Sequence, residues 1–205
     1  MTLIGLGEKV LVMRVFIAVL VLIFSLQSFA KADDISDFEI EGMSIGDSLL
    51  LHMSEDKILS LERYDVNSGY KSDKFFDVRT KKMGPYEEIL VGLKLNDKSY
   101  KIYALAGAAK YENNISDCYD EIEGIEKEFK NLFPNAEISK ENNVKHPYDK
   151  SGLSTVTSIY FNLKSGSYAS LQCFDWSKEI EFWDNLRIGI FSNSYAEWLV
   201  NEAHK

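Results

Sequence analysis

The 205-residue sequence has few of the residues that bind metals or act as nucleophiles in enzymes. It contains three histidines and two cysteines, and their positions match neither a Cys-x-x-Cys nor a His-x-x-x-His metal motif. It also lacks a Gly-x-Ser-x-Gly nucleophile elbow, a phosphate-binding loop ending in Lys-Ser/Thr, and an EF-hand loop. These absences predict a protein without a cofactor and favour a non-catalytic role. The alternative is an enzyme, such as a hydrolase, whose site is assembled from residues distant in sequence.

Basic residues are scarce relative to acidic ones. From Asp33 onward the chain has 20 basic and 31 acidic residues, a net charge of −11. Binding to nucleic acid or to an anionic membrane surface needs a high density of Lys and Arg, so this balance excludes both as expected partners. A cationic partner is compatible with it, as in an inhibitor-type protein that meets a basic target.

The sequence has one long apolar run, Val15–Leu26, near its N-terminus. Met13 and Arg14 precede it as a short positive segment, and Ala30 and Ala32 follow at the small positions of a cleavage site. These three parts are typical of a secretory signal peptide. No Cys stands at the cleavage point, so we do not expect a lipoprotein.

We therefore predict a signal peptide over residues 1–32, with the true start at Met13, and a single domain over residues 33–205. The alternative is an uncleaved anchor over 10–30, a length close to the roughly 20 residues of a membrane span. Arg14 interrupts that stretch, which favours cleavage. The predicted location is periplasmic or secreted, with no membrane insertion after cleavage.

Apolar periodicity predicts a mixed fold. Spacings of three and four over 115–132 predict a helix, and alternation with a period of two predicts strands. Asp47 or Ser48 can cap one short helix, and Ser54 can cap a second. Segment 135–152 has little periodicity and is predicted as a loop. The remaining predicted elements are strands over 74–80, 86–95, 99–108, 155–163, 167–176 and 185–191, and a C-terminal helix from Asn193 or Ser194.

These elements define an α+β protein with antiparallel sheet and the order αα-βββ-α-βββ-α. Short turns between neighbouring strands favour antiparallel pairing, and we expect the helices to pack on one face of the sheet. Two similar runs of three strands suggest a duplicated unit, although the sequences of the halves are not alike enough to establish one.

The two cysteines, Cys118 and Cys173, are predicted to form a structural disulfide. Cys118 lies on the apolar stripe of its helix, and Cys173 shares a strand face with Ala169 and Leu171. An exported protein with an even number of cysteines favours a bridge. Two buried free thiols are the alternative.

Aromatic residues in the second half suggest a binding surface. Tyr168, Phe174 and Trp176 share the strand parity opposite to the expected core face, and Arg187 lies on the non-core side of its own strand. If that face is uncovered, these four residues form an aromatic platform with a cation for a ligand or partner. The alternative is that helices or a second layer cover them.

Segment 37–50, DFEIEGMSIGDSLL, resembles the opening of a set of small, uncharacterised exported proteins of Gram-negative bacteria. The Gly42-Met43-Ser44 step before a helical hairpin and strands is similar to the small lipoprotein of the outer-membrane barrel-assembly machine, and to tandem αα-βββ β-lactamase inhibitor proteins. The resemblance covers 38–108 at most. It implies a periplasmic α+β protein that binds another protein, such as an envelope protein, and it assigns no functional residue.

Overall fold

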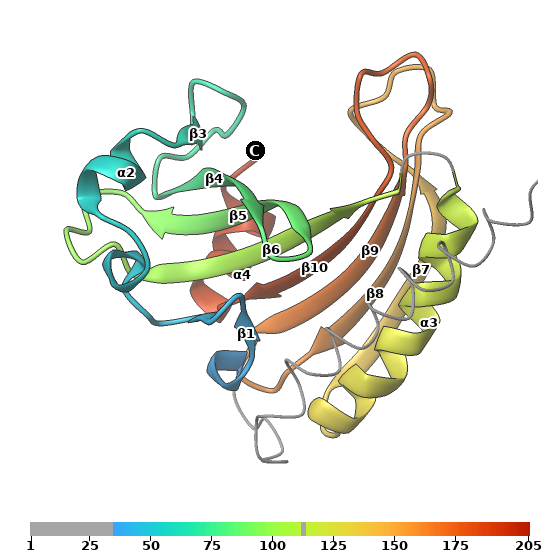
Figure 1. Ribbon diagram of the computed structural model, residues 1–205, viewed down its shortest axis with the longest axis horizontal. Helices are drawn as coiled ribbons and strands as arrows, with labels where there is room; N and C mark the ends of the chain where they lie inside the picture. Colours follow the sequence, from blue (N-terminus) through green and yellow to red (C-terminus); the bar gives the residue numbers. More distant parts are fainter. Residues whose placement is uncertain (1–34, 112–113) are drawn as a thin grey trace, which may run out of the picture. The chain divides into compact units, whose positions relative to one another are not determined.

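The chain folds around one eight-stranded antiparallel sheet in a computed structural model that describes residues 35–111 and 114–205 (Figure 1). The predicted signal peptide and its cleavage site before Asp33 lie outside the described residues. The order across the sheet is β3-β4-β5-β6-β10-β9-β8-β7. The strands are β3 (Glu62–Tyr64), β4 (Phe75–Met83), β5 (Tyr86–Lys94), β6 (Ile102–Lys110), β7 (Glu137–Lys145), β8 (Thr155–Asn162), β9 (Tyr168–Asp175) and β10 (Asn185–Phe191).

In the part of the chain that the structure describes, three α-helices accompany the sheet: α2 (Glu55–Leu59), α3 (Ile115–Leu132) and α4 (Asn193–Asn201). From α2 onward the order is α-ββββ-α-ββββ-α. The α+β class with antiparallel sheet is therefore confirmed, but the predicted order αα-βββ-α-βββ-α is wrong. Each half of the sheet has four strands that follow one helix, and the halves join where β6 pairs with β10.

Strand β7 replaces the loop predicted over 135–152. All but one of its residues are exposed, the exception being the half-buried Ile138. An edge strand that is polar on both sides gives no period-two signal, so its pairing with β8 could not be read from periodicity. Lysines at positions 140 and 145 and a register shift between Glu141 and Val144 are features that discourage pairing of an exposed edge with another chain.

The predicted helical hairpin is reduced to two short turns. Ser48 caps a 3-10 turn, Leu49–Leu51, and Ser54 caps α2. Both caps are confirmed, but the helices are shorter than predicted. The backbone N–H of Leu49 donates to the Tyr100 carbonyl at 2.9 Å, which ties this segment to the loop after β5.

Strand register defines two faces of the sheet. One row across the strands is formed by Val91, Leu105, Ile190, Ala169 and Phe161, and we call this side the first face. The residues that follow or precede these along each strand point to the opposite side, which we call the second face. The row on the second face is formed by Gly92, Ala104, Phe191, Tyr168 and Asn162.

Helix α3 packs on the first face, where the predicted disulfide is present. The bridge joins Cys118 of α3 to Cys173 of β9 with a Cα–Cα distance of 6.0 Å, and both residues are fully buried. Phe129 of the same helix packs against Phe161 of β8, with the ring centroids 5.4 Å apart. The apolar stripe of the predicted helix is therefore the surface that contacts the sheet.

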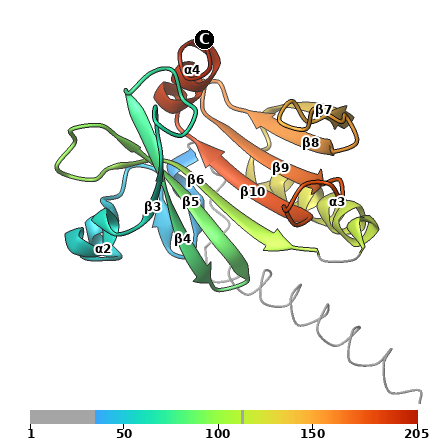
Figure 2. The ribbon, with the colours of Figure 1, turned by 90° about the horizontal axis from the view of Figure 1, so that it is seen from above.

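Helix α4 packs on the second face, so the expectation that all helices share one face is wrong (Figure 2). The register places Gly92 and Ala104 beneath it, and a Cβ on Gly92 would lie 2.6 Å from Cε2 of Tyr195. Small residues at these two positions leave room for the helix. The face on which α4 packs therefore depends on small residues in distant strands and cannot be derived from the periodicity of α4 itself.

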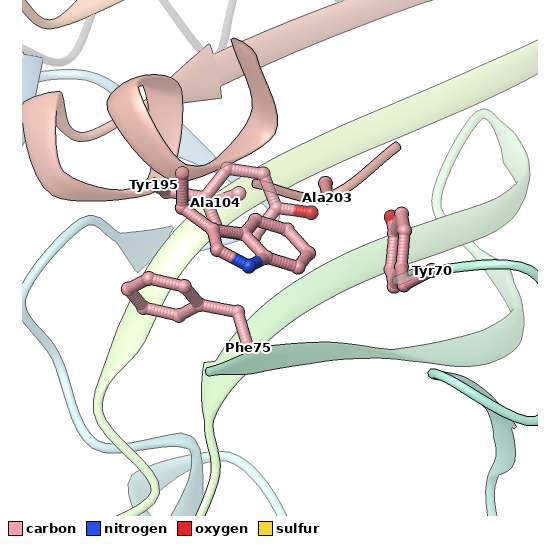
Figure 3. Packing of buried hydrophobic residues seen from close by; sticks show 6 residues of the cluster. Tyr70, Phe75, Ala104, Tyr195 and Ala203 are labelled. Carbon is pink, nitrogen blue, oxygen red and sulfur yellow. The ribbon is translucent and has the colours of Figure 1, made fainter. Parts of the chain in front are cut away.

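The contact between α4 and the sheet is an aromatic core (Figure 3). Trp198 is fully buried and lies 5.3 Å from Phe75 and 4.7 Å from Tyr70 between ring centroids. Beside it, the Asp77 carboxylate accepts hydrogen bonds from the hydroxyls of Tyr70 at 2.5 Å and Tyr195 at 2.7 Å. These bonds join β4, the loop before it and α4.

Candidate functional site

Two loops lie side by side at one end of the sheet (Figure 1). They are the β7–β8 loop, residues 146–154, and the β9–β10 loop, residues 176–184. The backbone N–H of Ser177 donates to Oγ of Ser154 at 2.9 Å, which ties one loop to the other. The backbone N–H of Trp176 donates to Oδ1 of Asp184 at 2.7 Å, which closes the second loop.

Asp149 organises the β7–β8 loop from within. Its carboxylate accepts hydrogen bonds from the backbone N–H groups of Ser151 and Ser154, both at 2.8 Å, and from both serine hydroxyls. The hydrogen bonds from the Ser154 and Ser151 hydroxyls hold the pKa of the Asp149 carboxyl well below its usual range. The loop is thus a hydrogen-bonded turn that can hold side chains in fixed positions.

Aromatic side chains from both loops meet the end of β9. Phe174 and Trp176 are nearly parallel, with ring centroids 5.9 Å apart, and the Trp176 ring also contacts His146 at 4.5 Å and Phe182 at 4.9 Å. Tyr148 lies 5.5 Å from Phe182. With Arg187 of β10, these residues form what we call the aromatic–arginine cluster. Its members are His146, Tyr148, Phe174, Trp176, Phe182 and Arg187.

Arg187 is the cation of this cluster. Its guanidinium carbon lies 4.6 Å from the centroid of the Phe174 ring, a cation–π distance. Among the described residues, no carboxylate lies within 4.0 Å of Arg187, and none of its N–H groups donates a hydrogen bond to a protein acceptor. Burial lowers the pKa of this guanidinium, which stays charged because the ordinary pKa of Arg is far above neutral.

Arg63 provides a contrast on the first face. Its guanidinium carbon lies 3.8 Å from the centroid of the Phe76 ring, so it is stacked in the same way as Arg187. However, Nε of Arg63 lies 2.8 Å from the carboxylate of Asp65. Two arginines thus stack on phenylalanines, and only one of the two is paired with an acid.

His146 sits against the buried side of the cluster. Its Nδ1 accepts a hydrogen bond from the backbone N–H of Tyr148 at 3.3 Å, which requires a neutral ring with the proton on Nε2. Burial, together with the nearby charge of Arg187, lowers the pKa of His146. This histidine therefore acts as a neutral aromatic surface in the cluster.

The cluster has an exposed apolar rim. Tyr148 is 63% exposed, Phe182 is 50% exposed, and the neighbouring Leu153 of the same loop is 63% exposed. Phe174, by contrast, is buried, and Trp176 and Arg187 are half-buried. A half-buried centre of Arg and Trp with exposed aromatic side chains around it has the composition of a protein–protein hot spot.

The structure brings together three of the four residues expected to bind a partner. Tyr168 lies at the other end of β9, six residues from Phe174, or about 20 Å along an extended strand. There it stacks on Phe191 with ring centroids 4.5 Å apart and contacts Tyr160. Tyr168 therefore belongs to a second aromatic group, and the expected single platform is divided in two.

His146 and Tyr148 were not among the expected site residues. They lie in the segment predicted as a loop, and their positions follow from the pairing of β7 with β8, which periodicity did not reveal. The His146-Pro147-Tyr148 sequence offers no signal of contact with Phe182, which lies more than thirty residues away.

Other parts of the described chain contain no comparable candidate site. A hollow of about 230 Å³ lies between α2 and β4, and its lining mixes aliphatic side chains such as Ile58 and Val78 with charged ones such as Lys94. Over residues 35–111 and 114–205 there is no group of three or more His, Cys, Asp or Glu side chains placed to hold a metal ion. In the same ranges no helix is both long enough and apolar enough to span a membrane.

Comparison with family models, curated proteins and solved structures finds no match in any of the three.

Proposed function

We propose that this protein is an exported, non-catalytic interaction module, and that the aromatic–arginine cluster is where it binds another envelope protein. The observation that carries this proposal is the exposed aromatic rim on two mutually bonded loops, continuous with the stacked Phe174 and Arg187. Large apolar side chains held in exposed positions by rigid loops are costly to solvate and are typical of contact surfaces.

The disulfide supports the proposed compartment. Cys118 and Cys173 are buried and bonded, and such bridges form and persist where the environment is oxidising. The predicted signal peptide points the same way. Together they favour a periplasmic or secreted protein.

An inhibitor-type protein is the second candidate within the same class. The observation that favours it is the arrangement of two helix-plus-four-strand units in one sheet, since a tandem arrangement is what the resemblance to β-lactamase inhibitor proteins implies. Under either reading the function is binding, and the net charge of −11 favours a target with basic residues around the contact.

Substitution of the exposed rim should abolish capture of the partner. We expect the double variant Tyr148→Ser, Phe182→Ser to retain at most about a tenth of the partner that the wild-type bait recovers from periplasmic extract, because hot-spot aromatics each contribute roughly tenfold or more. The measurement is quantitative mass spectrometry of proteins that remain bound after washing in about 0.15 M salt.

The matched control is Leu51→Ser, Leu59→Ser. Leu51 is 75% exposed and Leu59 is 69% exposed, so a similar apolar surface is removed near α2, away from the cluster. A protein captured equally by both double variants and the wild type does not bind at the cluster. If every captured protein behaves in that way, the proposed site is wrong.

A further inference from the structure

We infer that the aromatic–arginine cluster recognises an acidic side chain, Asp or Glu, that stands among apolar residues on the partner. This inference rests on the proposed function and adds the chemistry of the group that is bound. It starts from Arg187, a half-buried residue whose guanidinium carbon lies over the Phe174 ring without an acidic partner within 4.0 Å in the described residues.

The hydrogen-bonding edge of Arg187 is unused. A guanidinium has five N–H donors in a fixed planar fork, and none of those of Arg187 meets a protein acceptor in the described part of the chain. The Phe174 ring covers one side of the guanidinium, and the N–H donors remain for a ligand. A carboxylate can accept two parallel N–H bonds from that edge, which is the strongest common pairing of this group.

The neighbouring charges favour a single carboxylate over a phosphate. Arg79, the next cation on the second face, already lies 3.4 Å from Glu88 and 3.9 Å from Glu62. Glu88 and the buried Asp77 also act on Arg187 through their charge. A phosphate carries up to two negative charges, but the centre of the cluster offers one cation, Arg187, on which the charges of Glu88 and Asp77 already act. A carboxylate carries one charge and matches it.

The rim indicates what surrounds that carboxylate. Tyr148, Leu153 and Phe182 are at least half exposed, so the partner surface must place apolar groups beside its acidic residue to cover them. Further out, Glu179 and Glu181 of the β9–β10 loop are exposed, and so are Lys178 of that loop and Lys150 of the β7–β8 loop. The edge of the contact can therefore pair with charges of both signs. The breadth of the rim, over two loops, fits a folded surface better than a chain end.

A random dodecapeptide library displayed on phage tests this chemistry without knowledge of the partner. The bait is the exported protein with its disulfide formed, and selection takes place in about 0.15 M salt to screen the net charge. We expect enriched peptides with Asp or Glu at one fixed position between apolar residues. Their recovery should fall roughly 10- to 100-fold on Arg187→Gln and stay unchanged on Arg63→Gln, the arginine that already has an acidic partner.

A second measurement does not depend on how well the Arg187 variant folds. In a synthetic copy of an enriched peptide, replacement of the acidic residue by its amide, Glu to Gln or Asp to Asn, should weaken binding to the wild-type protein by a similar factor. Enriched peptides that lack an acidic residue, or that bind equally well with the amide, overturn the carboxylate inference. In that case the proposed binding surface is not contradicted. If no peptide depends on Phe182, the proposed binding surface fails as well.

Discussion

Removal of the disulfide should lower the free energy of unfolding by about 4 kcal/mol. Cys118 and Cys173 are 55 residues apart in sequence, and a bridge that closes a loop of that length restricts the unfolded chain by this amount in the chain-entropy model. The double variant Cys118→Ala, Cys173→Ala keeps apolar side chains at both fully buried positions. Urea or thermal unfolding, compared with the oxidised wild type, measures the difference.

Reduction gives the control for this experiment. A reducing agent should bring the stability of the wild type down toward that of the double variant and leave the variant itself unchanged. Thiol titration of denatured, unreduced wild type should find no free thiol, because the described chain has no unpaired cysteine. Equal stability of the wild type with and without the reducing agent would show that the bridge does not act as a structural staple.

The stability of the protein should also depend on Asp77 between pH 4 and pH 7. Burial raises the pKa of this carboxyl to about 6, although the hydroxyls of Tyr70 and Tyr195 act in the opposite direction by donating to the charged form. An unfolded chain has an Asp pKa of about 3.9. The folded state therefore holds the proton to a higher pH, and its stability falls by about 2 kcal/mol as the pH rises through this interval.

The variant Asp77→Asn has no such titration. Its free energy of unfolding, relative to the wild type, should rise by about 2 kcal/mol from pH 4 to pH 7, whatever the substitution costs at any one pH. Tyr195→Phe serves as a second variant, because loss of one donor to the carboxylate should raise the pKa of Asp77 further and move the transition to higher pH. If the free energies of unfolding of Asp77→Asn and the wild type change with pH in the same way, the expected pKa of Asp77 is wrong.

Periodicity predicted the elements that bury one apolar side. Helix α3 and strand β10 begin and end at the predicted residues, and β5, β8 and β9 lie within one residue of them. Strands β7 and β3 were missed because both lie at the edges of the sheet, where few side chains are buried and the sequence needs no alternation. The two-residue strands β1 (Glu39–Ile40) and β2 (Met43–Ser44) pair with each other and were also missed, because a strand of two residues is too short to show alternation.

The alternation of side chains along each strand predicted part of the candidate site. It assigns side chains to a face, so it placed Phe174 and Arg187 on the same side of neighbouring strands, where they stack. It carries no information on position along a strand, and so it grouped Tyr168 with residues at the opposite end. The contribution of Tyr148 depends on a loop-to-loop contact, and no property of a single segment predicts that.

The order of apolar and polar residues was sufficient by itself for the α+β class and for the pairing of Cys118 with Cys173, since each depends on which side of one element faces the core. Tertiary packing decided which face each helix covers and which aromatic residues meet at the loops. Those outcomes depend on small residues such as Gly92, and on hydrogen bonds such as Ser154 to Ser177, between segments far apart in the chain.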